Sequence, residues 1–378
     1  MFTTKKIAIV SVINDLVTDN RVNKTCFTLM ECDFNVVLIG RKLPNSLEIP
    51  FWPFKTIRMH MLFLTGPLFY LFFNFRLFFI LLIKKADLLY ANDLDTLLPN
   101  YLISKIKKLP LIYDSHELFC EVPELVNAPF KQNIWRRVEK HILPKLKFCI
   151  TVNDSIAKIF EKKYGVKFVA VRNISNTIEN FNPKSKGELG LPDNKKIILL
   201  QGAGINIDRG AEELLDAMRL VDNAILLIIG SGDVWTTLRE KIKKNYLEEK
   251  VFLIDKIPKQ ELMHYTFNAD LGLSIDKNTN LNYVNSLPNK IFDYIQAGVP
   301  ILASRLPEIE KIINDYKIGD FIADHQPENI AFKINEMLSS DKLLEYKNNT
   351  KLAAKELNWA NEKQKLISVI KSVTLKTT

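Results

Sequence analysis

The chain has 378 residues, of which 47% are hydrophobic, and its 52 Lys and Arg against 43 Asp and Glu give a net charge of +9. This length and composition predict two domains with full cores rather than one. The four cysteines, Cys26, Cys32, Cys120 and Cys149, exclude a dense disulfide framework and CxxC metal spacing, and they favour a reduced, cytoplasmic setting.

The positive charge is concentrated in the first part of the chain. Residues 1–150 hold 20 Lys and Arg and 13 Asp and Glu, a balance of +7, whereas the remaining 32 and 30 give only +2. No zinc-finger spacing, RNA-recognition signature or basic helix accompanies this charge, so we expect no nucleic-acid partner. An anionic membrane surface is the partner that this region favours.

Short apolar runs rich in Val, Ile and Leu alternate with helical patterns along the chain. Residues 1–13 predict the first strand rather than a signal peptide, because they lack a small-residue cleavage site. The predicted strands of the first half are residues 6–13, 34–40, 87–92, 109–115, 147–153 and 167–173. Those of the second half are residues 196–202, 224–230, 250–255, 270–275, 300–304 and 318–323.

Continuous apolar strands separated by helices are typical of parallel sheets that are covered on both faces. The pattern occurs twice, and residues 173–196, which are polar and contain two prolines, predict a linker between the two sets. We therefore predict an α/β fold with two doubly wound, Rossmann-like domains, residues 1–180 and 190–358, facing a cleft. Ligands in such sheets bind beyond the carboxyl ends of the strands.

The first strand-to-helix turn lies within residues 11–29. It lacks the GxGxxG fingerprint, which argues against a dinucleotide-binding dehydrogenase. Asp19 is expected to cap the following helix, and Arg21 is expected to project into the cleft, on the acceptor side.

An almost wholly apolar run covers residues 62–83. Gly66-Pro67 predicts a helix start, which leaves 16 apolar residues, fewer than the roughly 20 that a spanning helix needs. Arg76 in mid-run would cost about 2.5–3.5 kcal/mol on insertion scales, so no single transmembrane span is expected. Two interpretations stay open: a helix buried on all sides, or one that enters the membrane interface. Seven aromatic residues followed by Lys84-Lys85 favour the interface.

Two carboxylates follow the strand 87–92. Asp93 and Asp95 form an Asp-x-Asp pair that can hold a divalent metal in nucleotide-sugar chemistry. The alternative is that Asn92 or Asp93 caps the helix predicted over residues 96–108. We expect the cap and no metal, because no further carboxylate cluster is evident.

His116 follows the strand 109–115, on the ligand side of the first sheet. A lone loop histidine more often makes a structural hydrogen bond, but this position favours a functional one. Asp114 and Glu117 are close enough in sequence to orient the imidazole or to influence its charge.

In the second half, Arg209-Gly210 precedes a helix after the strand 196–202. A guanidinium there can bind a diphosphate through its fork of N–H groups. Gly230 and Gly232 lie in a similar turn and are expected to be structural.

Residues 285–304 contain a proline-bearing loop, a helix start and a buried strand. The first amides of a helix lack intrahelical partners and the helix dipole is positive there, so the start can bind an anion. Residues 286–290 carry no acidic side chain, and Asp293 is expected about three residues into the helix, where it could bind a sugar hydroxyl. The alternative is a capped helix with a solvent-facing acid.

Together these segments resemble the retaining glycosyltransferases of family 4, of bacterial surface-polysaccharide type, over nearly the whole chain. That family has the GT-B fold and an E-x7-E segment in which the first acid faces the transferred sugar and the second binds the ribose. The resemblance places these roles on Asn285 and Asp293. The diphosphate-binding loop between them is Ser286, Leu287, Pro288, Asn289 and Lys290.

The resemblance assigns further residues. Arg209 corresponds to the second of two phosphate-binding basic residues, whereas Ala203 occupies the first position. His116 corresponds to an active-site histidine and Ile257 to a backbone contact with the base. Residues 359–378 correspond to a closing helix that packs back on the first domain.

The resemblance implies a nucleotide-sugar-dependent hexosyltransferase that transfers a sugar to an acceptor hydroxyl with retention. His116, Arg209 and Asn285 would be catalytic, and Arg21 and Glu117 would lie on the acceptor side. Donors fixed at the diphosphate would stabilise the leaving group, so no metal or other cofactor is expected. The expected acceptor is lipid-linked or a glycan, in surface polysaccharide or lipid-linked glycan assembly, and the expected location is peripheral at the cytoplasmic face of the membrane.

Two alternatives remain. One is a nucleotide-sugar epimerase of the same fold, which would need no acceptor. The other is a non-catalytic nucleotide-sugar binder, which Asn285 and Ala203 would suit.

Overall fold

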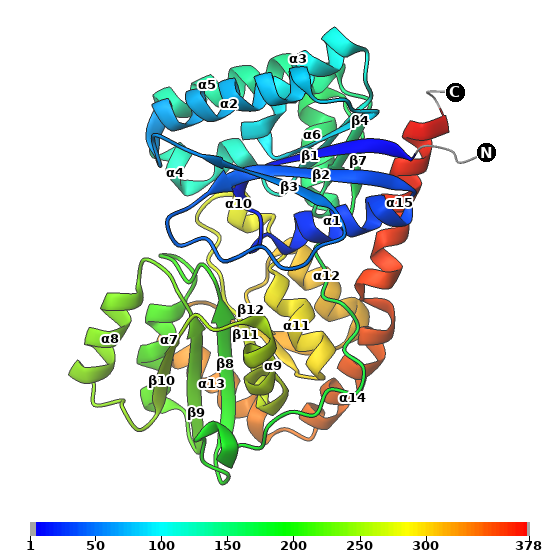
Figure 1. Ribbon diagram of the computed structural model, residues 1–378. Helices are drawn as coiled ribbons and strands as arrows, with labels where there is room; N and C mark the ends of the chain where they lie inside the picture. Colours follow the sequence, from blue (N-terminus) through cyan, green and yellow to red (C-terminus); the bar gives the residue numbers. More distant parts are fainter. Residues whose placement is uncertain (1–4, 376–378) are drawn as a thin grey trace. The chain divides into compact units, whose positions relative to one another are not determined.

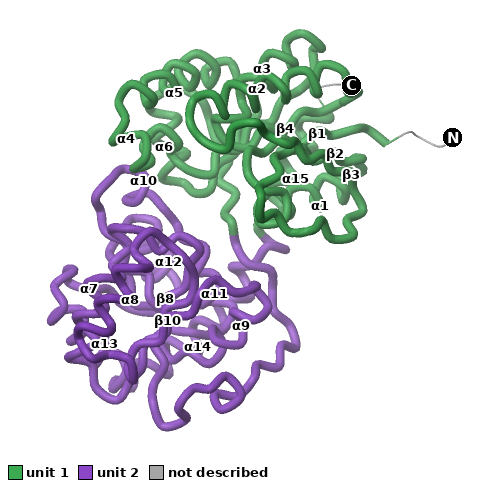
Figure 2. Tube along the Cα trace, turned by 60° about the vertical axis from the view of Figure 1, so that its left-hand side comes forward, with its two compact units in different colours: residues 1–173, 362–378 green, residues 174–361 purple. Residues whose placement is uncertain are grey.

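The computed structural model describes residues 5–375, which divide into two compact units. Unit 1 runs to Asn173 and resumes at Glu362, and unit 2 comprises Ile174–Asn361 (Figure 2). Each unit contains one wholly parallel sheet with helices on its faces (Figure 1). The predicted fold class, two Rossmann-like α/β domains, is confirmed.

The sheet of unit 1 has seven strands in the order β3-β2-β1-β4-β5-β6-β7. They are β1 (Lys6–Asp15), β2 (Phe34–Lys42), β3 (Lys55–His60), β4 (Leu88–Asn92), β5 (Leu111–Ser115), β6 (Phe148–Thr151) and β7 (Phe168–Ala170). Six of these were predicted. The edge strand β3 was missed, because four of the six residues in its sequence KTIRMH are polar and only Met59 is buried. The strand order reverses between β1 and β4, which is where such a sheet binds ligands.

The helices of unit 1 cover both faces of its sheet. They are α1 (Asn20–Glu31), α2 (Gly66–Ile83), α3 (Leu94–Lys107), α4 (Pro123–Val126), α5 (Pro129–Ile142), α6 (Asp154–Tyr164) and, from Glu362, α15 (Trp359–Leu375). Figure 1 shows α2, α3 and α5 together on one face and α1 and α15 on the other. The predicted cap of α1 is confirmed, since the Asp19 carboxylate accepts from the amide of Val22 at 3.1 Å.

Helix α2 is buried along one stripe only. Phe69, Phe73, Leu77 and Leu81 recur every four residues and pack into the core of unit 1. The other side chains of the helix are exposed or half-buried, so burial on all sides, one of the two open interpretations, is wrong. Among the described residues, α2 is the one helix that is long and apolar enough to cross a bilayer, judged by length and composition alone.

The sheet of unit 2 has six strands in the order β10-β9-β8-β11-β12-β13, and all six were predicted. They are β8 (Lys196–Gly202), β9 (Ala224–Gly230), β10 (Val251–Asp255), β11 (Leu271–Ser274), β12 (Ile301–Ala303) and β13 (Gly319–Phe321). The order reverses between β8 and β11. The loops that follow these two strands therefore meet at the ligand-binding end of this sheet.

The helices of unit 2 other than α10 pack on two apolar cores, one on each face of the sheet. They are α7 (Ala211–Ala217), α8 (Trp235–Lys244), α9 (Lys259–Asn268), α10 (Leu281–Val284), α11 (Asn289–Ala297), α12 (Pro307–Tyr316), α13 (Pro327–Ser339) and α14 (Lys342–Glu356). A Cβ atom at Gly230 would lie 1.7 Å from the carbonyl oxygen of Gly202. The turn after β9 therefore requires glycine for backbone packing, as predicted.

Candidate active site

Arg209 is held at the switch point of unit 2 by a buried carboxylate. Its Nη1 lies 2.9 Å from Oδ1 of Asp276, which follows β11 and is fully buried. The guanidinium also stacks over the Tyr283 ring, at 4.0 Å from the ring centroid. Gly210 lets the Arg209 loop approach β11 so closely, because a Cβ there would lie 2.4 Å from the Ile275 carbonyl oxygen. These contacts fix the direction of the guanidinium.

A second cation reaches the same carboxylate. Lys290 Nζ lies 3.7 Å from Oδ2 of Asp276. Burial alone would raise the pKa of Asp276, but the charges of Lys290 and Arg209 outweigh it and hold that pKa below its ordinary value. The pKa of Arg209 is raised, because Asp276 outweighs the effect of burial. Asp276 is therefore an anion, and Arg209 is a cation, at any physiological pH. Sequence analysis missed Asp276, whose only signal is its position just after a strand.

The predicted diphosphate loop leads into α11, whose N-terminus has no side-chain cap and no acid in its first turn. The amide of Ser286 already donates to the Tyr283 carbonyl at 3.1 Å, so it is not available to a ligand. The amides of Leu287, Asn289 and Lys290 have no acceptor within the part of the chain that the structure describes. These are the donors that an anion would find.

Asn285 lies at the end of α10, just before this loop. It is 8% exposed, and its Nδ2 donates to the Leu281 carbonyl at 2.8 Å. The side-chain amide of Asn285 thus has a local structural contact, and its expected role facing the transferred sugar remains a prediction.

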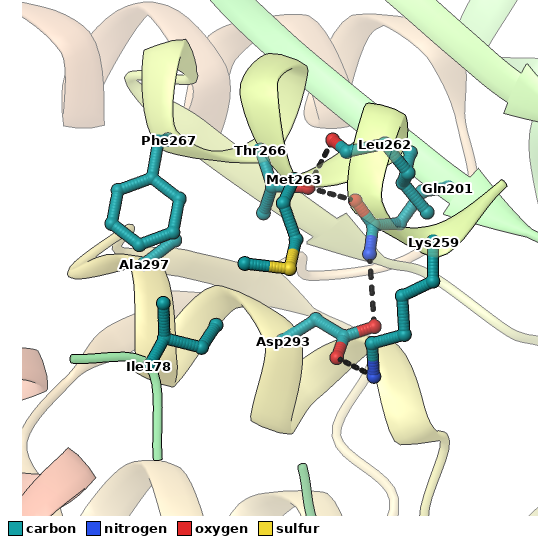
Figure 3. Close-up of a pocket in the computed structure, with 9 residues that line it drawn as sticks. All are labelled: Ile178, Gln201, Lys259, Leu262, Met263, Thr266, Phe267, Asp293 and Ala297. Carbon is teal, nitrogen blue, oxygen red and sulfur yellow. Dashed lines mark hydrogen bonds and ion pairs between the residues drawn. The ribbon is translucent and has the colours of Figure 1, made fainter. Parts of the chain in front are cut away.

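Asp293 lies in a polar network rather than in solvent (Figure 3). It is the fifth residue of α11, beyond the first turn. Its carboxylate pairs with Lys259 Nζ at 3.0 Å, accepts from Gln201 Nε2 at 3.2 Å and accepts from the Ser175 hydroxyl. The alternative of a solvent-facing helix acid is therefore wrong.

The surroundings of Asp293 form a small pocket with apolar walls. Gln201, at the end of β8, is oriented by Thr266, whose hydroxyl donates to Gln201 Oε1 at 2.8 Å. The apolar walls are Ile178, Leu262, Met263, Phe267 and Ala297 (Figure 3). Ile257 lies in the loop between β10 and α9, two residues before Lys259, and does not line this pocket. Its contact with a base remains a prediction.

In unit 1, His116 is held by Asp93. The Asp93 carboxylate accepts from the His116 amide at 2.8 Å and lies 3.1 Å from Nδ1 of the ring. On the other side, Nε2 lies 3.2 Å from Oδ1 of Asn92, whose own Nδ2 donates to the Ser11 carbonyl. Burial lowers the pKa of His116, and Asp114 offsets part of that effect. The structure thus builds an Asp93–His116–Asn92 cluster beyond β4 and β5.

The expected cap of α3 is wrong. Asp93 makes no side-chain hydrogen bond to the helix amides, because its carboxylate binds His116 instead. Its backbone, at φ 58° and ψ 167°, occupies a region that is almost restricted to glycine and that costs of order 1–3 kcal/mol. Asp93 therefore supports His116 more directly than the sequence-predicted Asp114, which lies 3.9 Å from Nε2. Glu117 is half-buried, and its acceptor-side role remains a prediction.

The expectation that Arg21 projects into a cleft is also wrong. Arg21 is 5% exposed, and its Nε and Nη2 donate to both oxygens of Asp114 at 3.1 and 2.7 Å. Its Nη1 donates to the Val171 carbonyl at 2.7 Å, and the Tyr90 hydroxyl donates to Asp114 at 2.8 Å. Arg21 therefore links α1 to β5 and to the segment after β7, which is a structural role.

Asp95, the other member of the Asp-x-Asp pair, is buried. It is 4% exposed, and Oδ1 has no hydrogen-bond partner among the described residues. Burial, followed by the charge of Glu117, raises its pKa to about 8. Within residues 5–375, no group of three or more His, Cys, Asp and Glu side chains is placed to hold a metal ion.

Replacing Asp95 with asparagine is expected to stabilise the protein at pH 8 and to flatten its pH dependence. The ordinary pKa of an Asp in the unfolded chain is about 3.9, whereas burial raises the pKa of Asp95 in the folded state to about 8. Between these values the folded state binds more protons, so stability contributed by this group is present at low pH and is lost as pH rises. Urea unfolding of the wild type and Asp95→Asn at several pH values from 5 to 8 measures the free energy of unfolding and its pH dependence. Asp33→Asn, at an exposed position, is the control, and an unchanged pH slope in Asp95→Asn would contradict the assignment.

Two protein-family models match the chain, one for each half. The model described as Glycosyltransferase Family 4 matches residues 22–179, and the model described as Glycosyl transferases group 1 matches residues 181–356. A curated chitobiosyldiphosphodolichol beta-mannosyltransferase from Candida albicans is 24% identical over 262 residues, which cover 63% of this chain and 56% of that protein. The chain spans about half the length of the curated relatives that it matches.

Solved structures share the whole architecture at low identity. Sucrose-phosphate synthase from Thermosynechococcus elongatus has a TM-score of 0.79 at 16% identity, over 98% of this chain and 100% of its own. HepE from Anabaena, solved with UDP and glucose, has a TM-score of 0.72 at 13% identity, over 97% of this chain and 100% of its own. At these low identities, both similarities establish the fold alone. Two family models together span almost the entire chain. The protein therefore belongs to the family 4 and group 1 glycosyltransferases and has the GT-B fold.

Proposed function

We propose that the protein transfers a hexosyl residue from a nucleoside-diphosphate sugar to an acceptor hydroxyl, with retention of configuration. The observation that carries this proposal is the arrangement at the switch point of unit 2. There Arg209 and the uncapped start of α11 are joined through Asp276, at the end of the sheet where a nucleotide binds. Departure of a diphosphate builds negative charge, and preorganised donors of this kind stabilise it.

The remaining residues take roles consistent with that reaction. Asp293 and its pocket bind the ribose, and Asn285 contacts the transferred sugar. His116, held by Asp93, contacts the sugar or the acceptor. The names of relatives support a hexosyl donor, because one is a mannosyltransferase and HepE was solved with UDP-glucose.

The experiment is a donor screen. The protein is incubated with UDP-, GDP- and ADP-hexoses, with and without a lipid extract, and products are identified by mass spectrometry. A glycosylated product that forms only with the extract supports transfer. An isomerised nucleotide sugar formed without extract would establish an epimerase, and nucleotide binding without turnover would establish a binder. Either result would overturn the proposal.

We further propose that unit 1 docks on an anionic membrane at the cytoplasmic face, where a lipid-linked acceptor of glycan assembly would be held. Large apolar side chains are exposed on the neighbouring helices α2, α3 and α5, which share one face of the sheet (Figure 1). They are Leu68, Leu71, Phe75, Phe79, Leu82 and Ile83 on α2, Leu98, Leu102 and Ile106 on α3, and Phe130 and Ile134 on α5. We call this set the apolar face of unit 1.

Basic side chains accompany the apolar face. Exposed cations on or next to these helices are Lys84, Lys85, Lys105, Lys131, Arg137 and Lys140. Each basic residue near an anionic leaflet contributes roughly 1 kcal/mol, and exposed Phe side chains add apolar burial at the interface. The Candida relative is named for a substrate that contains diphosphodolichol, a lipid carrier, which supports an acceptor of this kind.

Replacing Phe75 and Phe79 together with serine is expected to weaken sedimentation with anionic vesicles without unfolding the protein. Both are exposed, whereas Phe78 is half-buried against the core and is left unchanged. High salt should weaken the binding of the wild type, because ions screen the charge attraction. Phe332→Ser, at an exposed Phe of unit 2, is the control. Absence of vesicle binding by the wild type would refute docking, and recovery only by detergent would indicate deeper insertion.

A further inference from the structure

Lys290 is a cation in an unfavourable position. It is the second residue of α11, at the positive end of the helix dipole, and its side chain is only 11% exposed. Burial lowers the pKa of Lys290, and Asp276 offsets part of that effect. A buried lysine at a helix start costs stability unless something nearby holds the charge. The buried ammonium group of Lys290 therefore requires an anion close to it.

Asp276 alone does not account for Lys290. Arg209 already binds Asp276 at 2.9 Å, and the Ser274 hydroxyl donates to its second oxygen at 3.3 Å. The Lys290 contact is longer, at 3.7 Å. One carboxylate with two cations leaves a charge of +1 beside the positive helix end, so the cluster is prepared for a further anion.

The loop after β8 does not supply a second cation for binding a diphosphate. Between Gly202 and Asp208 its sequence is GAGINID, without a basic residue, and Arg209 is the first cation to follow β8. A diphosphate carries at least two negative charges, and Arg209 is partly neutralised by Asp276. Lys290 lies on the opposite oxygen of the same carboxylate, so the two cations converge on one place.

We propose that the Lys290 side chain binds the diphosphate of the donor as the second cation, together with Arg209, while Asp276 positions both. This inference rests on the proposed function and adds a residue to it. Lys290 thus acts through its ammonium group, besides the amide that the sequence analysis assigned to the loop. Charge-assisted hydrogen bonds of this type contribute about 1.5–3 kcal/mol.

Calorimetric titration with UDP, GDP and ADP and with the matching monophosphates UMP, GMP and AMP tests this proposal. We expect the wild type to prefer one diphosphate over its monophosphate. Lys290→Met should lower that preference by about 10- to 100-fold, which is the effect of one charge-assisted bond. Monophosphate affinity should stay nearly unchanged, and Lys290→Arg should retain most of the preference because it keeps the charge. Lys333→Met, which removes a half-buried lysine paired with Asp320, is the control.

The outcomes separate this inference from the proposed function. If the wild type binds none of UDP, GDP and ADP, the proposed function fails and the inference fails with it. If the wild type binds and Lys290→Met keeps the full diphosphate preference, only the inference fails. An unfolded Lys290→Met, seen by circular dichroism, would show that Lys290 is needed to neutralise Asp276 and would also overturn it.

Discussion

Replacing Arg209 with alanine is expected to lower the turnover number of sugar transfer by about 100- to 1000-fold. The guanidinium is held by Asp276 and stacked on Tyr283, so it is preorganised for the charge that develops on a leaving diphosphate. Loss of one such donor costs about 2.7–4 kcal/mol in comparable oxyanion sites. Steady-state kinetics at saturating donor measure the effect, with the donor and acceptor that the screen identifies.

Controls separate this effect from a loss of folding. Lys290 remains near Asp276 in Arg209→Ala, so the carboxylate keeps one cation. Arg209→Lys should recover only part of the rate, because lysine lacks the guanidinium fork. Arg239→Ala, at an exposed arginine of α8, should leave turnover unchanged. A turnover of Arg209→Ala within about twofold of the wild type would remove Arg209 from the site.

Replacing Arg21 with methionine is expected to destabilise unit 1 by about 3–5 kcal/mol, the usual cost of leaving one partner of a buried ion pair alone. The change removes both hydrogen bonds to Asp114 and the one to the Val171 carbonyl. Urea unfolding followed by circular dichroism measures the loss. The double variant Arg21→Met/Asp114→Leu should recover part of it, because the orphaned charge is then removed as well.

The Arg21–Asp114 pair also predicts a pH dependence. Burial would raise the pKa of Asp114, but Arg21 and His116 outweigh it, and the pKa lies below its ordinary value. The pair's contribution is therefore fully present above the ordinary Asp pKa of about 3.9 and is lost as pH falls through the lower folded value. Wild type and Arg21→Met should thus converge in stability at strongly acidic pH. A difference that persists undiminished there would contradict this account of the pair.

The sequence by itself determined the architecture. Apolar runs such as residues 196–202 and 224–230 can be satisfied only by burial on both faces, so they predict parallel sheets without knowledge of any contact. A local pattern also identified the Asp19 cap, because it depends on backbone geometry within a few residues. The turn pattern identified Gly230 as structural too, although the close contact that requires glycine there is with Gly202 on the neighbouring strand β8. The strand β3 was not predicted, because an edge strand buries too few side chains to produce an apolar pattern in the sequence.

Only the tertiary structure decided which polar residues meet. Arg21 pairs with Asp114, 93 residues later, and Arg209 pairs with Asp276, 67 residues later. Such partners leave no periodic signal, since a single charge looks the same in a sequence whether it faces solvent or a buried ion. For the same reason Asp93 looked like a helix cap, although the turn after β4 directs its carboxylate to His116. The sheet topology, which brings the ends of distant strands together, is the physical reason that the site could be located from sequence but not assembled from it.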